Sequence, residues 1–279
     1  INSNNPLELV LSTRSGIRKT NDGGATWNNV VGGSFQSLHQ KSGNPEILFA
    51  TTFNSSRIWR STDGGDTWSQ LIPNTVGLPT NARRMELAMT PADTNYIYCL
   101  AAGTDNGFLG LWRSTDGGNT WTQRSNSPNI LGGSTSGAGS GGQGWYDLAI
   151  AVAPDNREEI YTGGVNIWRS GNGGSTWSLN AHWFGGGGAP YVHADIHDLE
   201  FRPGTTTLYS CSDGGLDVTQ NDGGTWSELQ NGMNISQYYK ISTSNADSSR
   251  VLAGAQDNGT HRKQSGNTYN RVLGGDGMD

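Results

Sequence analysis

The sequence TNDGGATW (residues 20–27) is a short polar loop that ends in Thr-Trp, and it returns four times along the chain. The later copies are RSTDGGDTW (60–68), RSTDGGNTW (113–121), RSGNGGSTW (169–177) and TQNDGGTW (219–226). The closing tryptophans are 41, 53, 56 and 49 residues apart, and a degenerate sixth copy, QSGNTY, ends at Tyr269. A period of about 40–50 residues in a strand-rich chain is typical of four-stranded propeller blades.

Each period contains four strand-like segments in a fixed order. The third period shows an inner strand, RMELAMTP (84–91), then YIYCLAAG (96–103), LWRS (111–114) and TWTQRS (120–125). The repeated loop is therefore the turn between the third and fourth strands. The first period starts at LELVLST (7–13), without an inner strand. We predict an all-β propeller in a single domain, residues 1–279, with blades that end near Trp27, Trp68, Trp121, Trp177, Trp226 and Tyr269. About six blades of a seven- to ten-bladed propeller are expected, with a closed six-bladed ring as the alternative.

The composition limits the classes of partner. The 279 residues carry a net charge of -6 and no run of Lys or Arg, so binding to nucleic acid is not expected. Membrane insertion is not expected either, because no apolar stretch approaches 18 residues. The chain begins without Met or a signal-peptide pattern, which is typical of a mature or trimmed piece. Cys99 and Cys211 lie in strand-like segments and are predicted to be buried free thiols.

The repeated loop itself predicts a structural role. An Asp or Asn in a tight turn accepts hydrogen bonds from the backbone, glycine adopts conformations closed to other residues, and the Trp packs between sheets. Copies spread around a ring cannot converge on one ligand, although direct binding remains the alternative. The predicted structural residues are Asp22, Trp27, Asp63, Trp68, Asp116, Trp121, Asn172, Trp177, Asn221 and Trp226.

The TxDGGxTW pattern resembles the Asp-box, or bacterial neuraminidase repeat, of sialidases, xyloglucanases and the sortilin luminal domain. The segments PYVHADIHDLEF (190–201), CSDGGLDVTQNDGGTW (211–226), GAQDNGT (254–260) and LGGDGMD (273–279) resemble secreted sortilin-like propellers of Bacteroidetes-type bacteria. This resemblance implies a secreted or cell-surface protein, part of a larger surface protein or assembly. It implies no particular reaction.

The face opposite the Asp-boxes carries the candidate site. Loops between second and third strands share that face with the segments that lead into inner strands, and these loops are acidic. Their carboxylates could bind a cation such as calcium, recognise sugar hydroxyls, or act as an acid and a nucleophile, whereas turn formation is the alternative. The candidates are Asp147, Asp195, Asp213, Asp257, Asn258 and Asp276. Asp195 and Asp213 are the first catalytic pair to test.

The segment His193-Ala-Asp195-Ile-His197 invites a metal interpretation. In a regular strand the two histidines would lie about 13 Å apart, too far to share one zinc ion. Leu199 continues the same face, so His197 is expected to enter the packing. His193 is kept as a ligand-binding candidate, and no metal site is assigned.

Aromatic residues on a glycine-rich loop are the other candidates. Trp183 and Tyr191 lie in LNAHWFGGGGAPYV (179–192), where they could stack on sugars or grip a peptide. The alternative is a hydrophobic plug across neighbouring blades.

The predicted function is a secreted recognition module that binds a glycan or an extracellular polypeptide. A glycoside hydrolase or lyase that uses a carboxylate pair is one alternative, and a structural or adhesin component is another. The arginine triad of sialidases is absent, because Arg83 and Arg84 are adjacent and no other arginines complete the set. Xyloglucanase-type chemistry requires aspartates from two propellers, and this chain accounts for at most one.

Overall fold

A computed structural model describes residues 1–229, 233, 236–244, 246–247, 249–264, 266 and 268–277. The predicted segments QSGNTY and LGGDGMD include Ser265, Asn267, Met278 and Asp279, which lie outside the described residues. The described chain forms six antiparallel sheets that follow one another in sequence, which confirms the predicted all-β fold. A four-residue helix, α1 (Pro73–Val76), interrupts them. In these ranges no helix is long and apolar enough to cross a membrane.

Each sheet is a meander of consecutive strands. The first contains β1 (Leu9–Thr13), β2 (Gly16–Thr20) and β3 (Asn28–Val31). The second contains β4 (Phe35–Gln40), β5 (Leu48–Thr52), β6 (Ile58–Ser61) and β7 (Ser69–Gln70). The third contains β8 (Arg84–Met89), β9 (Ile97–Ala102), β10 (Phe108–Ser114) and β11 (Thr122–Ser125).

The C-terminal half repeats the pattern. The fourth sheet contains β12 (Ala149–Val152), β13 (Ile160–Gly163), β14 (Ile167–Ser170) and β15 (Ser178–Ala181). The fifth contains β16 (Ile196–Phe201), β17 (Leu208–Ser212), β18 (Gly215–Thr219) and β19 (Ser227–Glu228). The sixth contains β20 (Tyr238–Thr243), β21 (Val251–Ala255), β22 (Gly259–Lys263) and β23 (Tyr269–Leu273). The first sheet has three strands, which confirms the prediction that its inner strand is missing. The inner strand of the second sheet, β4, was not identified from the sequence.

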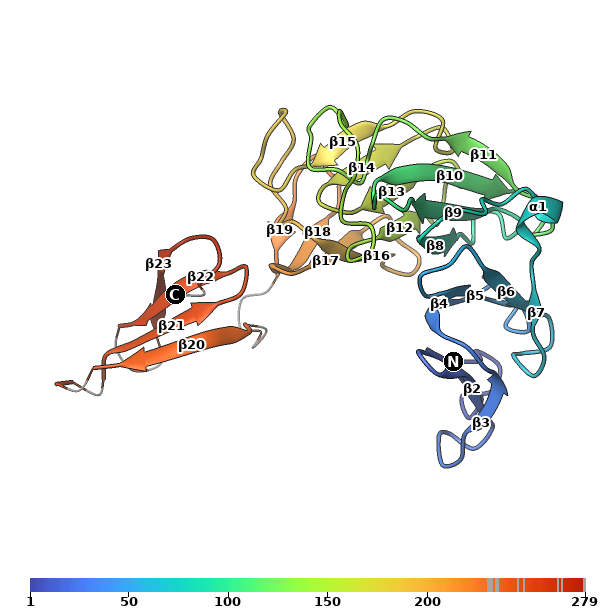
Figure 1. Ribbon diagram of the computed structural model, residues 1–279, viewed down its shortest axis with the longest axis horizontal. Helices are drawn as coiled ribbons and strands as arrows, with labels where there is room; N and C mark the ends of the chain where they lie inside the picture. The colour runs from blue at the N-terminus through green and yellow to red at the C-terminus, as the bar shows by residue number, and fades with distance from the viewer. Residues whose placement is uncertain are drawn as a thin grey trace.

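The core lies between successive sheets rather than within one of them. Phe49 and Ile58 of the second sheet pack with Met85 and Ile97 of the third, and similar clusters join the first sheet to the second, the third to the fourth and the fourth to the fifth. These five sheets follow an arc, and the sixth lies apart from it (Figure 1). Along β20 every residue is exposed, so the fifth and sixth sheets meet through loops and not through an apolar core.

The first Asp-box shows how the repeated loop closes. Asp22 accepts hydrogen bonds from the Thr26 backbone N–H at 2.8 Å and from the hydroxyls of Thr20 and Thr26, each at 2.6 Å. The Trp27 indole N–H donates to the Gly24 carbonyl at 3.1 Å, which pins the ring to the loop. Gly23 and Gly24 have φ values of 71° and 97°, a region that favours glycine.

The asparagine boxes keep the loop without its charge. Asn172 Oδ1 accepts from the Thr176 backbone N–H at 2.9 Å, and Asn221 Oδ1 accepts from that of Thr225 at 2.9 Å. Each amide nitrogen then donates to the threonine hydroxyl, at 2.8 Å and 3.1 Å, which reverses the direction seen with Asp. Hydrogen bonding, rather than negative charge, is therefore what the turn requires.

The cysteine prediction is half right. Both cysteines are free, and Cys99 is buried in β9, where the loss of water raises the pKa of its thiol. Cys211 on β17 is exposed, and the expectation of burial was wrong for it. Burial of β17 alternates with its pleat, so Leu208 and Ser210 are buried while Cys211 points the other way.

Candidate functional site

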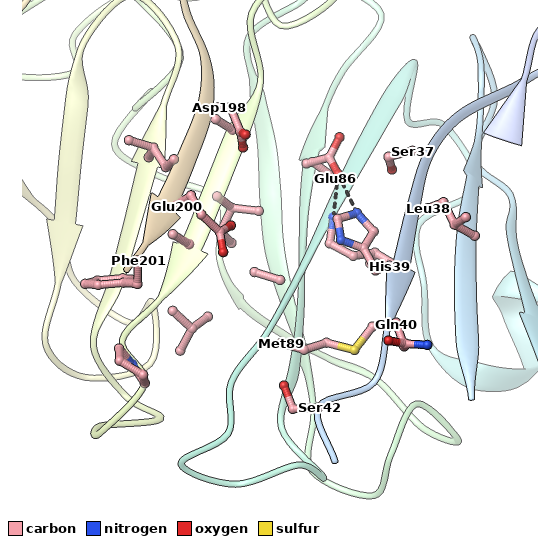
Figure 2. Close-up of a pocket in the computed structure, with 18 of the residues that line it drawn as sticks. Ser37, Leu38, His39, Gln40, Ser42, Glu86, Met89, Asp198, Glu200 and Phe201 are labelled. Atoms are coloured by element: carbon pink, nitrogen blue, oxygen red, sulfur yellow. Dashed lines mark hydrogen bonds and ion pairs between the residues drawn. The ribbon is translucent and has the colours of Figure 1, made fainter. Parts of the chain in front are cut away.

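The inner strands β4, β8, β12 and β16 surround a central cavity of about 760 Å³. Figure 2 shows His39 and Glu86 reaching toward each other between β4 and β8, with an Nε2 to Oε1 distance of 2.7 Å. Asp198 and Glu200 lie on β16 (Figure 2). Loss of water raises the pKa of both carboxyls. The negative charge of Glu86 raises the pKa of Asp198 further, and the negative charge of Asp198 raises that of Glu200 further. The cavity wall thus carries three carboxyls, and Arg84 and Arg202 also line it.

Asp213 lies near the end of this cavity, in the turn between β17 and β18. Its Oδ1 is 2.7 Å from Nε2 of His197, a residue that lines the cavity, and its Oδ2 accepts the Tyr146 hydroxyl at 2.7 Å. The Tyr146 and His197 rings meet edge to face, with centroids 4.8 Å apart. The hydrogen bond to Asp213, followed by burial, raises the pKa of Tyr146, so this hydroxyl remains a donor. Asp213 is held at both oxygens.

Asp195 and Asp147 are two further carboxyl groups of the candidate site. Gln143 Nε2 donates to Asp195 Oδ1 at 2.8 Å, and the carboxyl oxygens of Asp147 have no hydrogen-bond partner among the described residues. Asp147 is completely buried. The loss of water, followed by the Asp195 charge, raises the pKa of Asp147 to about 8, while Arg84 opposes the increase. Burial and the neighbouring charge thus both favour the protonated form of Asp147.

The sixth sheet extends the cluster. The Asp257 backbone N–H donates to Asp276 Oδ1 at 2.9 Å, and Asn258 Nδ2 donates to the Asp213 carbonyl at 3.3 Å. His193 Nε2 lies 3.4 Å from the Asp257 carbonyl. Burial raises the pKa of the Asp257 carboxyl, and repulsion from Asp213 and Asp276 adds to it. These contacts join Asp213 to Asn258, and Asp257 to His193 and Asp276, whereas Asp147 and Asp195 lie in the loops that lead into β12 and β16.

The predicted aromatic residues lie on a neighbouring loop. Trp183 is 45% exposed and lies against His182 and Phe184, whereas Tyr191 is 46% exposed beside the fifth sheet, with Asp217 and Glu228 among its charged neighbours. His182 is buried and receives the backbone N–H groups of Phe184 and Gly186 on its Nδ1. Trp183 and Tyr191 therefore flank the acidic cluster and do not belong to it.

The expectation that His197 enters the packing was wrong. The argument assumed a regular strand from His193 onward, but β16 begins at Ile196 and Asp195 has a φ of 64°. The register also shifts between Ile196 and Asp198, which places an extra residue in the strand. His197 is therefore exposed on the site.

Three further residues escaped sequence reasoning. Tyr146 and Gln143 lie in the segment before β12, and Arg84 donates across the sheets to the carbonyls of Trp145, Tyr146 and Leu148 at 3.4, 2.8 and 3.4 Å. The pairing of Arg84 with carbonyls 61 to 64 residues away has no local sequence signal. Within the described residues, no group of three His, Cys, Asp or Glu side chains could hold a metal ion.

Curated proteins that match part of this chain include xyloglucanases of bacteria and a fungus. No protein-family model matches the chain. A Paenibacillus xyloglucanase is 30% identical over 184 residues, which make up 61% of this chain and 17% of that protein. A xyloglucanase of Hypocrea jecorina is 30% identical over 207 residues, or 63% of this chain and 23% of that protein. The chain spans less than a quarter of the length of these curated relatives.

Solved structures agree on the fold. The GH74 xyloglucanase of Xanthomonas campestris superposes with a TM-score of 0.66 at 15% identity and covers 99% of this chain and 45% of that one. The Niastella koreensis GH74 enzyme gives a TM-score of 0.59 at 18% identity and covers 98% of this chain and 44% of that one. The narrower resemblance to sortilin-like propellers gains no support from these relatives. The chain is an Asp-box-type β-propeller related to xyloglucanases.

Proposed function

We propose that this chain binds and hydrolyses a polysaccharide at the acidic mouth of its central cavity, as a glycoside hydrolase. The observation that carries the proposal is the arrangement of Asp195 and Asp213. Both lie in loops of the fifth sheet and accept hydrogen bonds from side chains: Gln143 donates to Asp195, and Tyr146 and His197 hold Asp213. His197 also lines the cavity. The sequence similarity to xyloglucanases makes xyloglucan the first substrate to test. Because Asp195 and Asp213 belong to one propeller, the proposed pair differs from the two-propeller aspartates of xyloglucanase-type chemistry.

The chemistry of glycoside hydrolysis requires two carboxyl groups in different states. One protonates the oxygen of the leaving sugar, and the other, ionised, activates water or attacks the sugar. Asp213 is assigned the role of base, because it is oriented at both oxygens by the Tyr146 hydroxyl and the His197 ring. Asp195, which accepts a hydrogen bond from Gln143, is assigned the role of acid.

Exposed aromatic rings provide the surface for the polysaccharide. Trp145 is 53% exposed, and its ring centroid lies 5.4 Å from that of Tyr146, which holds Asp213. Trp183 and Phe184, 45% and 61% exposed, add a second platform. Flat apolar rings with polar edges suit the faces of sugar rings. An aromatic side chain also loses little conformational entropy when a sugar ring stacks on it.

The test measures binding and cleavage separately. The 279-residue chain is incubated with xyloglucan and a panel of other plant and bacterial polysaccharides; calorimetry reports binding, and new reducing ends report hydrolysis. Asp195→Asn and Asp213→Asn should each reduce hydrolysis at least 100-fold and retain binding. Asp155→Asn, an exposed aspartate away from the mouth, is the matched control. Hydrolysis that survives both substitutions would overturn the assignment.

A recognition module is the second candidate, and the partial coverage of the relatives favours it. The chain spans only 17% and 23% of the two xyloglucanases, so it could supply binding without the complete catalytic site. Binding without new reducing ends would select this function. With either function we place the protein outside the cell or on its surface, where such polysaccharides occur.

A further inference from the structure

A second pocket lies on the face that carries the acidic loops. Its volume is about 470 Å³, which is within the range of ligand pockets. The β5–β6 turn, the segment that leads into β8 and the β9–β10 turn line it. These loops occupy the same positions in their sheets as the loops of the fifth sheet that carry Asp195 and Asp213. The second and third sheets therefore present this pocket on the same side of the molecule as the candidate site.

Two arginines give the pocket its charge. Arg57 lies in the β5–β6 turn and Arg83 lies directly before β8, and both line the pocket. Of the pocket-lining residues in the described chain, none is Asp or Glu, and most of the others are polar, such as Ser55 and Asn81. This arginine pocket is therefore positively charged in a chain whose net charge is -6.

The two guanidinium groups are not neutralised by carboxylates in the described part of the chain. Arg57 is exposed, and its side chain has no hydrogen-bond or ion-pair partner there. Arg83 donates from Nη1 to the neutral amide oxygen of Asn106 at 2.9 Å. The carboxylate of Asp105, in the same turn as Asn106, accepts from two backbone N–H groups instead, each at 3.1 Å. The remaining N–H groups of both arginines therefore have no partner among the described residues.

The β9–β10 turn connects the arginine pocket to the candidate site. Asn106, which accepts from Arg83, also accepts the Gly144 backbone N–H on its carbonyl at 3.0 Å. Gly144 precedes Trp145, whose exposed ring lies against Tyr146. A polysaccharide on this face could therefore extend from the acidic mouth, past Trp145, to the arginines.

The charges of the two regions select different parts of a ligand. Asp195, Asp213 and Asp257 repel a negatively charged sugar. A planar guanidinium group, in contrast, binds a carboxylate through two parallel hydrogen bonds. We propose that the arginine pocket binds a uronate residue of an acidic polysaccharide, whose neutral part lies at the mouth. The position of the neutral part rests on the proposed function, whereas the carboxylate site does not.

Matched polysaccharides test the preference for a carboxylate. Each member of a panel of uronate-bearing polysaccharides is compared with the same material after its carboxyl groups have been reduced to alcohols, and calorimetry measures both affinities at low salt. At least one uronate-bearing member should bind about tenfold more tightly than its reduced counterpart, because hydrogen bonds between charged groups are stronger than neutral ones. Addition of about 0.5 M NaCl should remove most of this preference, because salt screens exposed charges.

Arginine variants locate the preference. Arg57→Gln and Arg83→Gln should each lower the affinity for the uronate-bearing polysaccharide about fivefold and leave the affinity for the reduced one unchanged. Arg18→Gln, at an exposed position on β2, is the matched control and should change neither affinity. Urea unfolding of each variant checks that the affinities are compared between folded proteins.

Two results would overturn the inference. One is that no member of the panel binds more tightly than its reduced counterpart, and the other is that the preference is unchanged in both Arg57→Gln and Arg83→Gln. Cleavage is measured separately as new reducing ends. An arginine-dependent preference without cleavage of any polysaccharide contradicts the proposed hydrolysis alone, whereas cleavage without this preference contradicts the uronate site alone.

Discussion

Replacing Asp147 by asparagine should make the stability of the protein less dependent on pH. The side chain is buried without a donor, and its pKa is raised from 3.8 to about 8. The folded protein therefore keeps a proton that the unfolded chain releases above pH 3.8. Stability contributed by this proton is complete below pH 3.8 and is lost as the pH rises toward 8.

The magnitude follows from the linkage between protons and folding. Between the two pKa values the folded state holds one proton more than the unfolded state. The free energy of unfolding therefore falls by about 1.4 kcal/mol for each unit by which the pH is raised. Between pH 5 and pH 8 the wild-type protein should lose about 4 kcal/mol relative to Asp147→Asn. Domains are stable by only about 5–15 kcal/mol, so the effect is large.

Urea unfolding followed by tryptophan fluorescence at pH 5, 6, 7 and 8 measures this difference. Asp155→Asn, at an exposed position, should follow the wild-type curve throughout. If wild type and Asp147→Asn show parallel curves, Asp147 is already ionised in the folded protein. The argument from its burial would then be refuted.

Four further measurements address the scaffold and the site. Arg84→Met should destabilise the protein by about 2–4 kcal/mol in urea unfolding, since three carbonyls lose a charged donor; an unchanged midpoint would contradict this. Tyr146→Phe should lower polysaccharide cleavage about tenfold and leave folding intact, because Asp213 loses one of two hydrogen bonds. Asp63→Ala should cost about 1–3 kcal/mol, whereas Asp63→Asn should cost less than 1 kcal/mol, because two natural boxes function with asparagine. Hydrogen bonds from Thr20 and Thr26 lower the pKa of Asp22 to about 2. Amide-exchange protection of the Thr26 N–H should therefore persist at pH 4 and be lost as the pH falls through about 2, and Asp22→Asn should abolish this dependence.

Much of the fold could be predicted because its determinants are local. The Asp-box needs only neighbours within four residues, as the bonds of Asp22 to Thr20 and Thr26 show. Strands such as β8 and β9 follow from short apolar runs and lie within the predicted segments RMELAMTP and YIYCLAAG. The order of strands in a meander then fixes which loops share a face.

The composition of the site was predicted better than its contacts. The sequence placed Asp147, Asp195, Asp213 and Asp257 on one face, since all lie in loops opposite the boxes. It misjudged His197, because a β-bulge at the start of β16 breaks the alternation on which the prediction relied. A one-residue bulge depends on how β16 pairs with β17 and has no local signature here.

Sequence alone therefore determined the blades, their order and the face that carries the acidic loops, because turns and strand alternation act over a few residues. Only the tertiary structure decided that Tyr146 and His197 hold Asp213, that Asp147 is buried, and that Arg84 ties the third sheet to the loop before β12. Those contacts join residues 16 to 67 positions apart. Their geometry and their electrostatics arise from the packing of one blade on the next.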